Sequence, residues 1–165
     1  MTKRERIEAA RSRKPVDHPP VAAWRHAPEV DHTAAGLADA MLAFHRRWDL
    51  DLITITPSGG YCGEDWGCRV ACTGSPGGAK QCTEHAVRAP SDWARIKPLD
   101  PGAGARGREL EALRRIARGR RDDAPVLHTI FSPLTTARTL AGSVAHPVSG
   151  AAQTAAAPAG GAWSP

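Results

Sequence analysis

The sequence predicts an α/β fold in which short apolar strands alternate with amphipathic helices. Residues 52–56 form an unbroken run of aliphatic and β-branched side chains, and residues 125–131 form a second, mainly apolar stretch that includes His128. Helical periodicity occupies residues 33–48 and returns over residues 106–118. A strand, a crossover helix and a second strand make a βαβ unit, which implies a parallel sheet. At 165 residues the chain is long enough for one ordinary domain.

The amino-terminal segment is predicted to be a capped helix followed by an extended stretch. Thr2 and Glu5 have the spacing of a capping box, which starts a helix that reaches about Ser12. Residues 14–20 contain three prolines, which bias the preceding residues to extended geometry. Residues 21–24 then read as the first strand, so that this strand, the helix at 33–48 and the strand at 52–56 would form the first βαβ unit.

The helix over residues 33–48 has the clearest pattern in the chain. Its apolar residues recur at intervals of three and four, which places them on one face: Leu37, Met41, Phe44 and Trp48. The helix leads into the strand at 52–56. That strand ends where Pro57 removes a backbone donor and Ser58-Gly59-Gly60 favours a turn.

The remaining segments are assigned in order. We expect a loop or short irregular strands at 68–87, a turn of helix at 90–93, a helix at 106–118 with Gly119 as its cap, a third strand at 125–131, and a helix from Ser132 to about Leu140. His128, inside the third strand, is expected to be a satisfied core histidine. In total the ordered chain would hold about three strand–helix units.

The carboxyl-terminal segment differs in composition from the rest. Of the 21 residues from 145 to 165, 16 are Ala, Gly, Pro or Ser, and such a segment buries too little apolar surface to offset its ordering entropy. We expect one domain over residues 1–143 and a disordered tail over residues 144–165.

The charge balance favours anionic partners. The chain has 22 basic and 17 acidic residues and a formal charge of +5. We expect an anionic small molecule as the partner, and not nucleic acid. The arginine cluster at 114–121 lacks nearby aromatic residues, and a solvated helix face explains it more simply. A non-enzymatic binding module that uses this helix is the alternative.

No apolar run of membrane-spanning or signal-peptide character is present, which predicts a cytoplasmic protein with its four cysteines reduced and no membrane partner. The cysteine spacings match no ordinary zinc pattern.

Polar side chains gather where two of the predicted strands end, which is where α/β folds hold their sites. Arg25 is a candidate for substrate binding or a surface arginine paired with an acidic neighbour, and His26 is a candidate proton donor or a loop hydrogen-bonding group. After the strand at 52–56, Glu64 is a catalytic candidate, and Asp65 and Tyr61 are candidates for substrate binding. Their plainer interpretations are carboxylates that cap free amides and an aromatic ring that packs the loop.

Several short motifs in register resemble the uroporphyrinogen decarboxylase family. They are Lys3-Arg4-Glu5-Arg6 with Asp17-His18-Pro19-Pro20-Val21, then Trp24-Arg25-His26, then the stretch 49–67 with its Glu-x-x-Gly loop, and last Pro125-Val126-Leu127 with Phe131-Ser132-Pro133-Leu134-Thr135-Thr136-Ala137. The resemblance covers residues 1 to about 143. It implies a (β/α)8 barrel about twice as long as this chain, with the site at the carboxyl ends of the strands. The chain would then be an amino-terminal part of that barrel, about its first three β/α units, and truncated.

The resemblance also implies an activity. Typical members decarboxylate uroporphyrinogen without metal or organic cofactor, with arginines that hold the substrate's carboxylates and an aspartate near the second strand. This chain departs from that pattern: only Arg25 matches the paired arginines, and Thr56-Pro57 stands near the aspartate's position. We therefore expect decarboxylation of a porphyrinogen-like or another carboxylated substrate. The alternative is a relative of the corrinoid-dependent methyltransferases, which use a zinc-bound thiol and whose zinc ligands lie in the later half of the barrel. At full length, a homodimer is expected.

Overall fold

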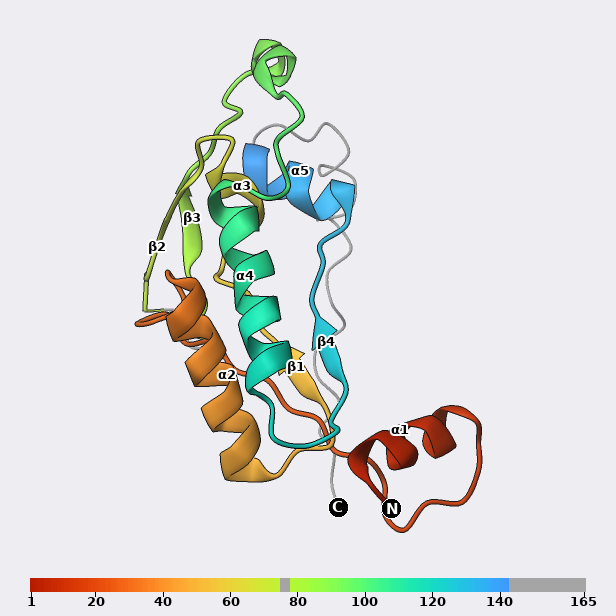
Figure 1. Ribbon diagram of the computed structural model, residues 1–165. Helices are drawn as coiled ribbons and strands as arrows, with labels where there is room; N and C mark the ends of the chain where they lie inside the picture. Colours follow the sequence, from red (N-terminus) through yellow and green to blue (C-terminus); the bar gives the residue numbers. More distant parts are fainter. Residues whose placement is uncertain (75–77, 143–165) are drawn as a thin grey trace, which may run out of the picture.

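The computed structural model describes residues 1–74 and 78–142, and it has the predicted alternation of helices and short strands (Figure 1). The predicted disorder of residues 144–165 lies outside the described residues. In chain order the elements are α1 (Lys3–Arg11), α2 (Ala34–Trp48), β1 (Ile53–Ile55), α3 (Tyr61–Glu64), β2 (Arg69–Ala71), β3 (Gln81–Glu84), the 3-10 helix η1 (Pro90–Arg95), α4 (Gly104–Gly119), β4 (Val126–His128) and α5 (Pro133–Ala141).

The described strands form two separate pairs. β1 and β4 are parallel, with Ile53 opposite Val126 and Ile55 opposite His128. The connection between them contains α4, so the parallel arrangement that the sequence predicts is confirmed for these two strands. β2 and β3 form an antiparallel ribbon within the segment that was predicted to hold short irregular strands. Its strand β2 lies beside α3 (Figure 1).

The predicted strand at 21–24 does not form, so the prediction of a first βαβ unit from this segment is wrong. Val21 is linked to Asp51 at two points: its N–H donates to Oδ2 at 2.8 Å, and its C=O accepts from the Asp51 N–H at 2.9 Å. Beyond that point, among the described residues, no neighbouring strand continues the ladder. Val21 and Trp24 are accordingly more than half exposed, at 54% and 62%, instead of buried.

The main core lies where α2 and α4 pack side by side against β1 (Figure 1). Thr33 caps α2 by accepting from the Gly36 N–H at 3.0 Å, as a side-chain oxygen at this position commonly does. The buried apolar residues come from both helices and from the strand: Leu37, Ala38, Met41, Leu42, Ile53, Ile55, Ala112 and Ile116. Trp48, predicted on the same apolar face, is 59% exposed, because it lies at the last residue of α2 beyond the reach of α4.

Ion pairs tie together the amino ends of the two parallel strands. Arg6 on α1 bonds Asp51, which precedes β1, and also bonds Asp17 through Nε and Nη2 at 2.7 and 2.9 Å. Lys3 and His45 both bond the carboxylate of Asp122, which precedes β4, at 2.9 and 2.8 Å. The predicted capping box of Thr2 and Glu5 is confirmed, and it fixes α1 so that Lys3 and Arg6 reach these carboxylates. We call these ion pairs the amino-end network.

Apolar side chains on and after β4 are left uncovered by the described residues. Leu127 on β4 is 53% exposed, Ile130 is 80% exposed, and Leu134 at the start of α5 is 75% exposed. Within the described part of the chain, β4 pairs with β1 alone. Because strands of all-parallel sheets are normally covered on both faces, this side of the molecule is suited to contact further polypeptide. No described helix is both long and apolar enough to cross a membrane.

Candidate functional site

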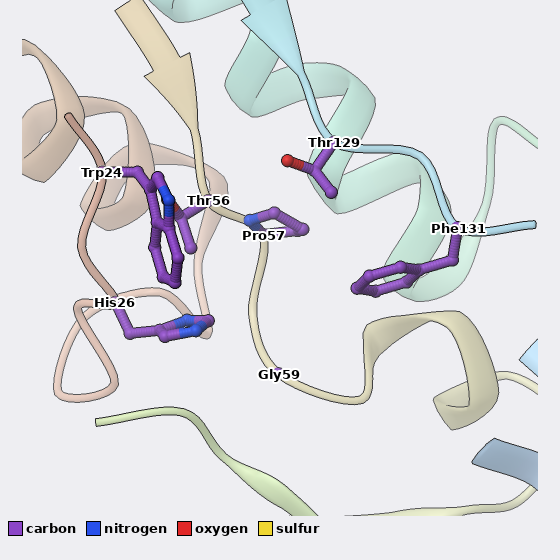
Figure 2. A pocket seen from close by; sticks show the side chains of 7 residues that line it. All are labelled: Trp24, His26, Thr56, Pro57, Gly59, Thr129 and Phe131. Atoms are coloured by element: carbon purple, nitrogen blue, oxygen red, sulfur yellow. The ribbon is translucent and has the colours of Figure 1, made fainter. Parts of the chain in front are cut away.

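A pocket lies where β1 and β4 end, and we call it the strand-end pocket (Figure 2). Its volume is about 350 Å³. Thr56, Pro57 and Gly59 reach it from the turn after β1, Thr129 and Phe131 from the segment after β4, and Trp24 and His26 from the extended stretch before α2. The pocket therefore stands at the position where the sequence predicted a site, at the carboxyl ends of parallel strands.

His26 is the predicted catalytic residue that lies in this pocket. Its ring meets that of Trp24 edge to face, with 5.6 Å between centroids and 82° between planes. Figure 2 shows both rings on one side of Pro57 and the Phe131 ring on the other. The His26 Nδ1 is buried, and no described residue offers it a hydrogen bond. Buried polar atoms ordinarily have a partner, so this nitrogen is unusual. The predicted role of His26 as a proton donor stays a prediction.

Arg25, the predicted substrate-binding arginine, does not line the pocket. Its side chain is exposed, and its Nε donates to the His26 carbonyl at 3.3 Å. The acidic neighbours that could pair with it at the surface are Glu29 and Asp31. Of these, Asp31 is instead fully buried and paired with Lys80. Arg25 therefore lies at the rim next to His26, and its binding role stays a prediction.

Glu64 and Asp65 point away from the strand-end pocket and bond to α4. Arg108 holds Glu64 in a bidentate pair through Nη1 and Nη2, at 3.1 and 3.0 Å. Burial alone would lower the pKa of Arg108, but the hydrogen bonds and charge of Glu64 raise it. Asp65 accepts from the Ala105 and Arg106 N–H groups at 2.8 and 3.3 Å, which is the amide-capping role that the sequence left as the plainer interpretation. Neither carboxylate lines the strand-end pocket, and the roles predicted for them in catalysis and substrate binding stay predictions.

Tyr61 packs directly behind the pocket. It is buried, its ring centroid lies 5.8 Å from that of Phe131 and 6.5 Å from that of His128, and its hydroxyl points to the Thr129 carbonyl at 3.5 Å. Burial raises the pKa of the Tyr61 phenol, which keeps it a neutral donor. Tyr61 thus contacts pocket-lining residues without lining the pocket itself, and direct substrate binding by it stays a prediction.

A buried polar cluster beneath the turn after β1 was not identified from the sequence. It consists of Asp31, Ser58, Lys80 and Glu109. Lys80 bonds Asp31 and approaches the Ser58 Oγ at 3.4 Å. A Cβ at Gly59 would collide with the Lys80 backbone, so only glycine allows this close approach. The cluster therefore fixes the turn that carries Pro57 and Gly59 into the pocket.

Glu109 is the least satisfied member of this cluster. It is 2% exposed, and neither carboxylate oxygen finds a hydrogen bond of good geometry among the described residues; the Arg108 Nε lies 3.5 Å from Oε1. Burial raises the pKa of Glu109 to about 7, and the charge of Asp31 adds to this shift while that of Arg108 opposes it. The members come from sequence positions far apart and share no motif, so no local pattern could have joined them.

Two more polar groups near the strand ends lack partners. The Thr56 Oγ1 is buried and without a hydrogen bond among the described residues, and the same is true of the His128 Nδ1. The expectation of a satisfied core histidine at His128 is therefore wrong, because the side chain packs toward Tyr61 instead of toward a polar partner. Burial lowers the pKa of His128, so this imidazole is neutral near pH 7.

No metal centre is formed by the described side chains, since they contain no group of three or more His, Cys, Asp or Glu with suitable geometry. The buried cysteines instead contact Thr139: the Cys62 Sγ lies 3.6 Å from its hydroxyl and the Cys68 Sγ 3.6 Å from its carbonyl. A zinc site of the methyltransferase type is thus not supplied by residues 1–74 and 78–142.

The parallel strands, their covering helices and the pocket at the carboxyl ends form an α/β arrangement of the kind found in barrel enzymes. A sequence model of the uroporphyrinogen decarboxylase (URO-D) family matches residues 2–155, and the chain belongs to this family. Among solved structures, a methyltransferase from Methanosarcina mazei is similar in fold, with a TM-score of 0.69 and 22% sequence identity. The match covers 86% of this chain and 46% of that chain, so the chain spans less than half the length of this relative. No curated protein matches the sequence.

Proposed function

We propose that the strand-end pocket is one wall of a site where a carboxylated substrate, porphyrinogen-like or another, loses CO2 without a metal or organic cofactor. The observation that carries this proposal is the buried, partnerless His26 Nδ1 in a mostly apolar pocket at the strand ends. Family membership supports a decarboxylase-like reaction. Since the match covers 46% of the similar structure, further strand–helix units are proposed to complete the site, and they would cover the exposed Leu127 and Ile130.

Decarboxylation makes a specific demand that His26 is placed to meet. The bond between the carboxylate carbon and its neighbour breaks, CO2 leaves, and the electron pair stays on the neighbouring carbon. That carbon must then receive a proton, and His26 is the proposed donor, reprotonated from solvent. The apolar walls of Trp24, Pro57 and Phe131 favour loss of the charged carboxylate as neutral CO2. Arg25 at the rim would hold a second carboxylate of the substrate.

The test is His26→Gln in the protein that carries the remaining barrel units, with uroporphyrinogen as the first probe and CO2 release as the readout. Removing a general acid is expected to lower the rate about 10²-fold or more. His32→Gln is the matched control, because His32 is exposed and does not line the pocket. Equal rates in the two variants would contradict the proposed role of His26, and no CO2 release from any carboxylated probe would contradict the reaction class.

A methyltransferase-type activity is the second candidate, because the similar structure is named as a methyltransferase. Under this alternative the zinc ligands would belong to polypeptide beyond the described residues, which form no such cluster. Zinc content of the protein with its remaining units separates the two candidates. One tightly bound zinc per chain together with methyl transfer and no CO2 release would favour the methyltransferase.

A further inference from the structure

A second pocket lies beside the strand-end pocket and shares Phe131 with it. We call it the Trp66–Arg106 pocket. Its volume is about 380 Å³, and it opens between α4, α5 and η1. Its walls are mostly apolar and include Trp66, Trp93, Ile96, Phe131 and Leu140, with Arg106 as its one charged group. The proposed decarboxylation uses neither Arg106 nor the two tryptophans.

The position of Arg106 is fixed by stacking. Its guanidinium lies over the Trp66 ring, 4.8 Å from the ring centroid. Trp66 is in turn held by its indole N–H, which donates to the Lys97 carbonyl at 2.7 Å. Stacking engages the face of the guanidinium and leaves the N–H groups at its edge free to bind an anion. A planar fork held in place in this way loses little freedom when it binds a carboxylate.

Arg106 also lacks a carboxylate partner within the described part of the chain. Its neighbour Arg108 is paired with Glu64, and Arg95 on η1 is paired with Asp92 at 2.8 Å. The side chain of Arg106 takes part in no ion pair among the described residues, although it borders an apolar pocket. Asp65, the nearest carboxylate in sequence to Trp66, uses both oxygens to cap the amides of α4.

We propose that the Trp66–Arg106 pocket binds a small planar carboxylate. The aromatic walls Trp93 and Phe131 would hold the flat apolar body, and the edge of Arg106 would bond the carboxylate in bidentate fashion. The volume suits a one- or two-ring ligand. This pocket is separate from the strand-end pocket, and its occupancy does not depend on the decarboxylation proposed above.

The probe for this proposal is a fluoronaphthoate, with binding followed by fluorine NMR on the chain as it stands. The corresponding fluoronaphthamide has the same rings without the charge, and it is expected to bind about tenfold more weakly, since hydrogen bonds to charged groups are stronger than those to neutral ones. This comparison needs no variant, so it stays decisive even where a substitution impairs folding. Equal affinity for the two probes, or no binding of the carboxylate at millimolar concentration, would overturn the proposal.

Variants then locate the site. Arg106→Gln is expected to weaken fluoronaphthoate binding about tenfold, whereas Arg95→Gln, which removes an exposed and already paired arginine, leaves it within about twofold. Trp93→Ala should weaken binding, and Trp24→Ala, which alters only the strand-end pocket, should not. A loss with Arg95→Gln as large as with Arg106→Gln would show general charge attraction instead of this site. Loss of binding with Trp24→Ala would place the probe in the strand-end pocket, and either result would overturn the assignment.

Discussion

The two ends of the same pair of strands are built in opposite ways. At the amino ends, Asp51 and Asp122 are met by Arg6, Lys3 and His45, so the charges before β1 and β4 are paired. At the carboxyl ends, the His26 Nδ1, the Thr56 Oγ1 and the His128 Nδ1 are buried without partners among the described residues. Buried polar groups are ordinarily satisfied. The amino end also has such an atom, the His45 Nδ1, so the two ends differ chiefly in how their charged groups are paired.

This difference parallels the division of roles between the two strand ends in barrel folds. In barrel folds, residues at the amino ends of strands contribute to stability, and those at the carboxyl ends form the site. The Arg6 guanidinium holds the pKa of Asp17 well below its usual range, and Lys3 and His45 lower the pKa of Asp122 to about 2 although its burial acts in the opposite direction. The carboxylates of Asp17 and Asp122 are therefore charged at neutral pH, while the polar atoms named at the carboxyl end have no partner among the described residues.

The largest effect is expected from Arg6→Met, which breaks the amino-end network. Asp51 is 3% exposed and would keep a buried charge without its partner. Removing one member of a buried pair costs about 3–5 kcal/mol, so urea unfolding at pH 7 should show a loss of that size. Arg4→Met is the matched control on the same helix, since Arg4 is exposed and its nearest oxygen on Glu8 lies at 3.9 Å. An Arg6→Met cost no greater than that of Arg4→Met would mean that the network does not stabilise the fold.

An intermediate effect is expected from Glu109→Gln, and it should depend on pH. The pKa of Glu109 is about 7 in the folded chain and 4.5 for an ordinary glutamate, so the folded state binds the proton more tightly. The wild-type chain therefore loses stability as pH rises from about 4.5 to 7, and the loss is complete above that range. Glutamine removes this titration. The variant should gain about 2–3 kcal/mol relative to wild type between pH 5 and pH 8, measured by unfolding at both values.

Glu111→Gln provides the control for this pH dependence. Glu111 lies on the same helix and pairs with Arg115 at 3.0 Å on the helix surface. Surface substitutions of this kind change stability by no more than about 0.5 kcal/mol. A stability difference between Glu109→Gln and wild type that is the same at pH 5 and pH 8 would show that Glu109 is not held in its neutral form by the fold.

The sequence predicted the local elements better than the site. The capping box at Thr2, the helix that begins after Thr33 and the strand around Ile53 depend on neighbouring residues, and all three are confirmed. The strand predicted at 21–24 depends on a neighbouring strand, which residue pattern does not reveal. Thr56 could be placed at the pocket by counting from the end of the strand around Ile53, because parallel strands end at one edge. His26 lines the same pocket although the strand predicted before it does not form.

The buried polar cluster could not be predicted, for a physical reason. Lys80 reaches Asp31 across 49 positions, and Glu109 meets the turn after β1 from a helix far along the chain. Each of these residues looks like an ordinary surface charge in its own segment. Long-range contacts also determine where Glu64 and Asp65 lie. Adjacent carboxylates near a strand end suggested a site, and in the structure Glu64 bonds Arg108 while Asp65 bonds the amides of α4.

The smallest change in unfolding free energy is expected from Thr56→Val at the carboxyl end. The sign of that change tests the contrast between the two strand ends. Thr56 is 6% exposed with an unpaired Oγ1, and valine has nearly the same shape without the hydroxyl. Replacing an unsatisfied buried polar group by an apolar one of equal size removes a desolvation penalty, so stability should stay equal or rise by about 1 kcal/mol in urea unfolding. Groups kept at such a cost are typical of functional sites, where stability is exchanged for activity. A loss of 1 kcal/mol or more would instead show that the Thr56 hydroxyl stabilises the folded chain, and the carboxyl end would then resemble the amino end.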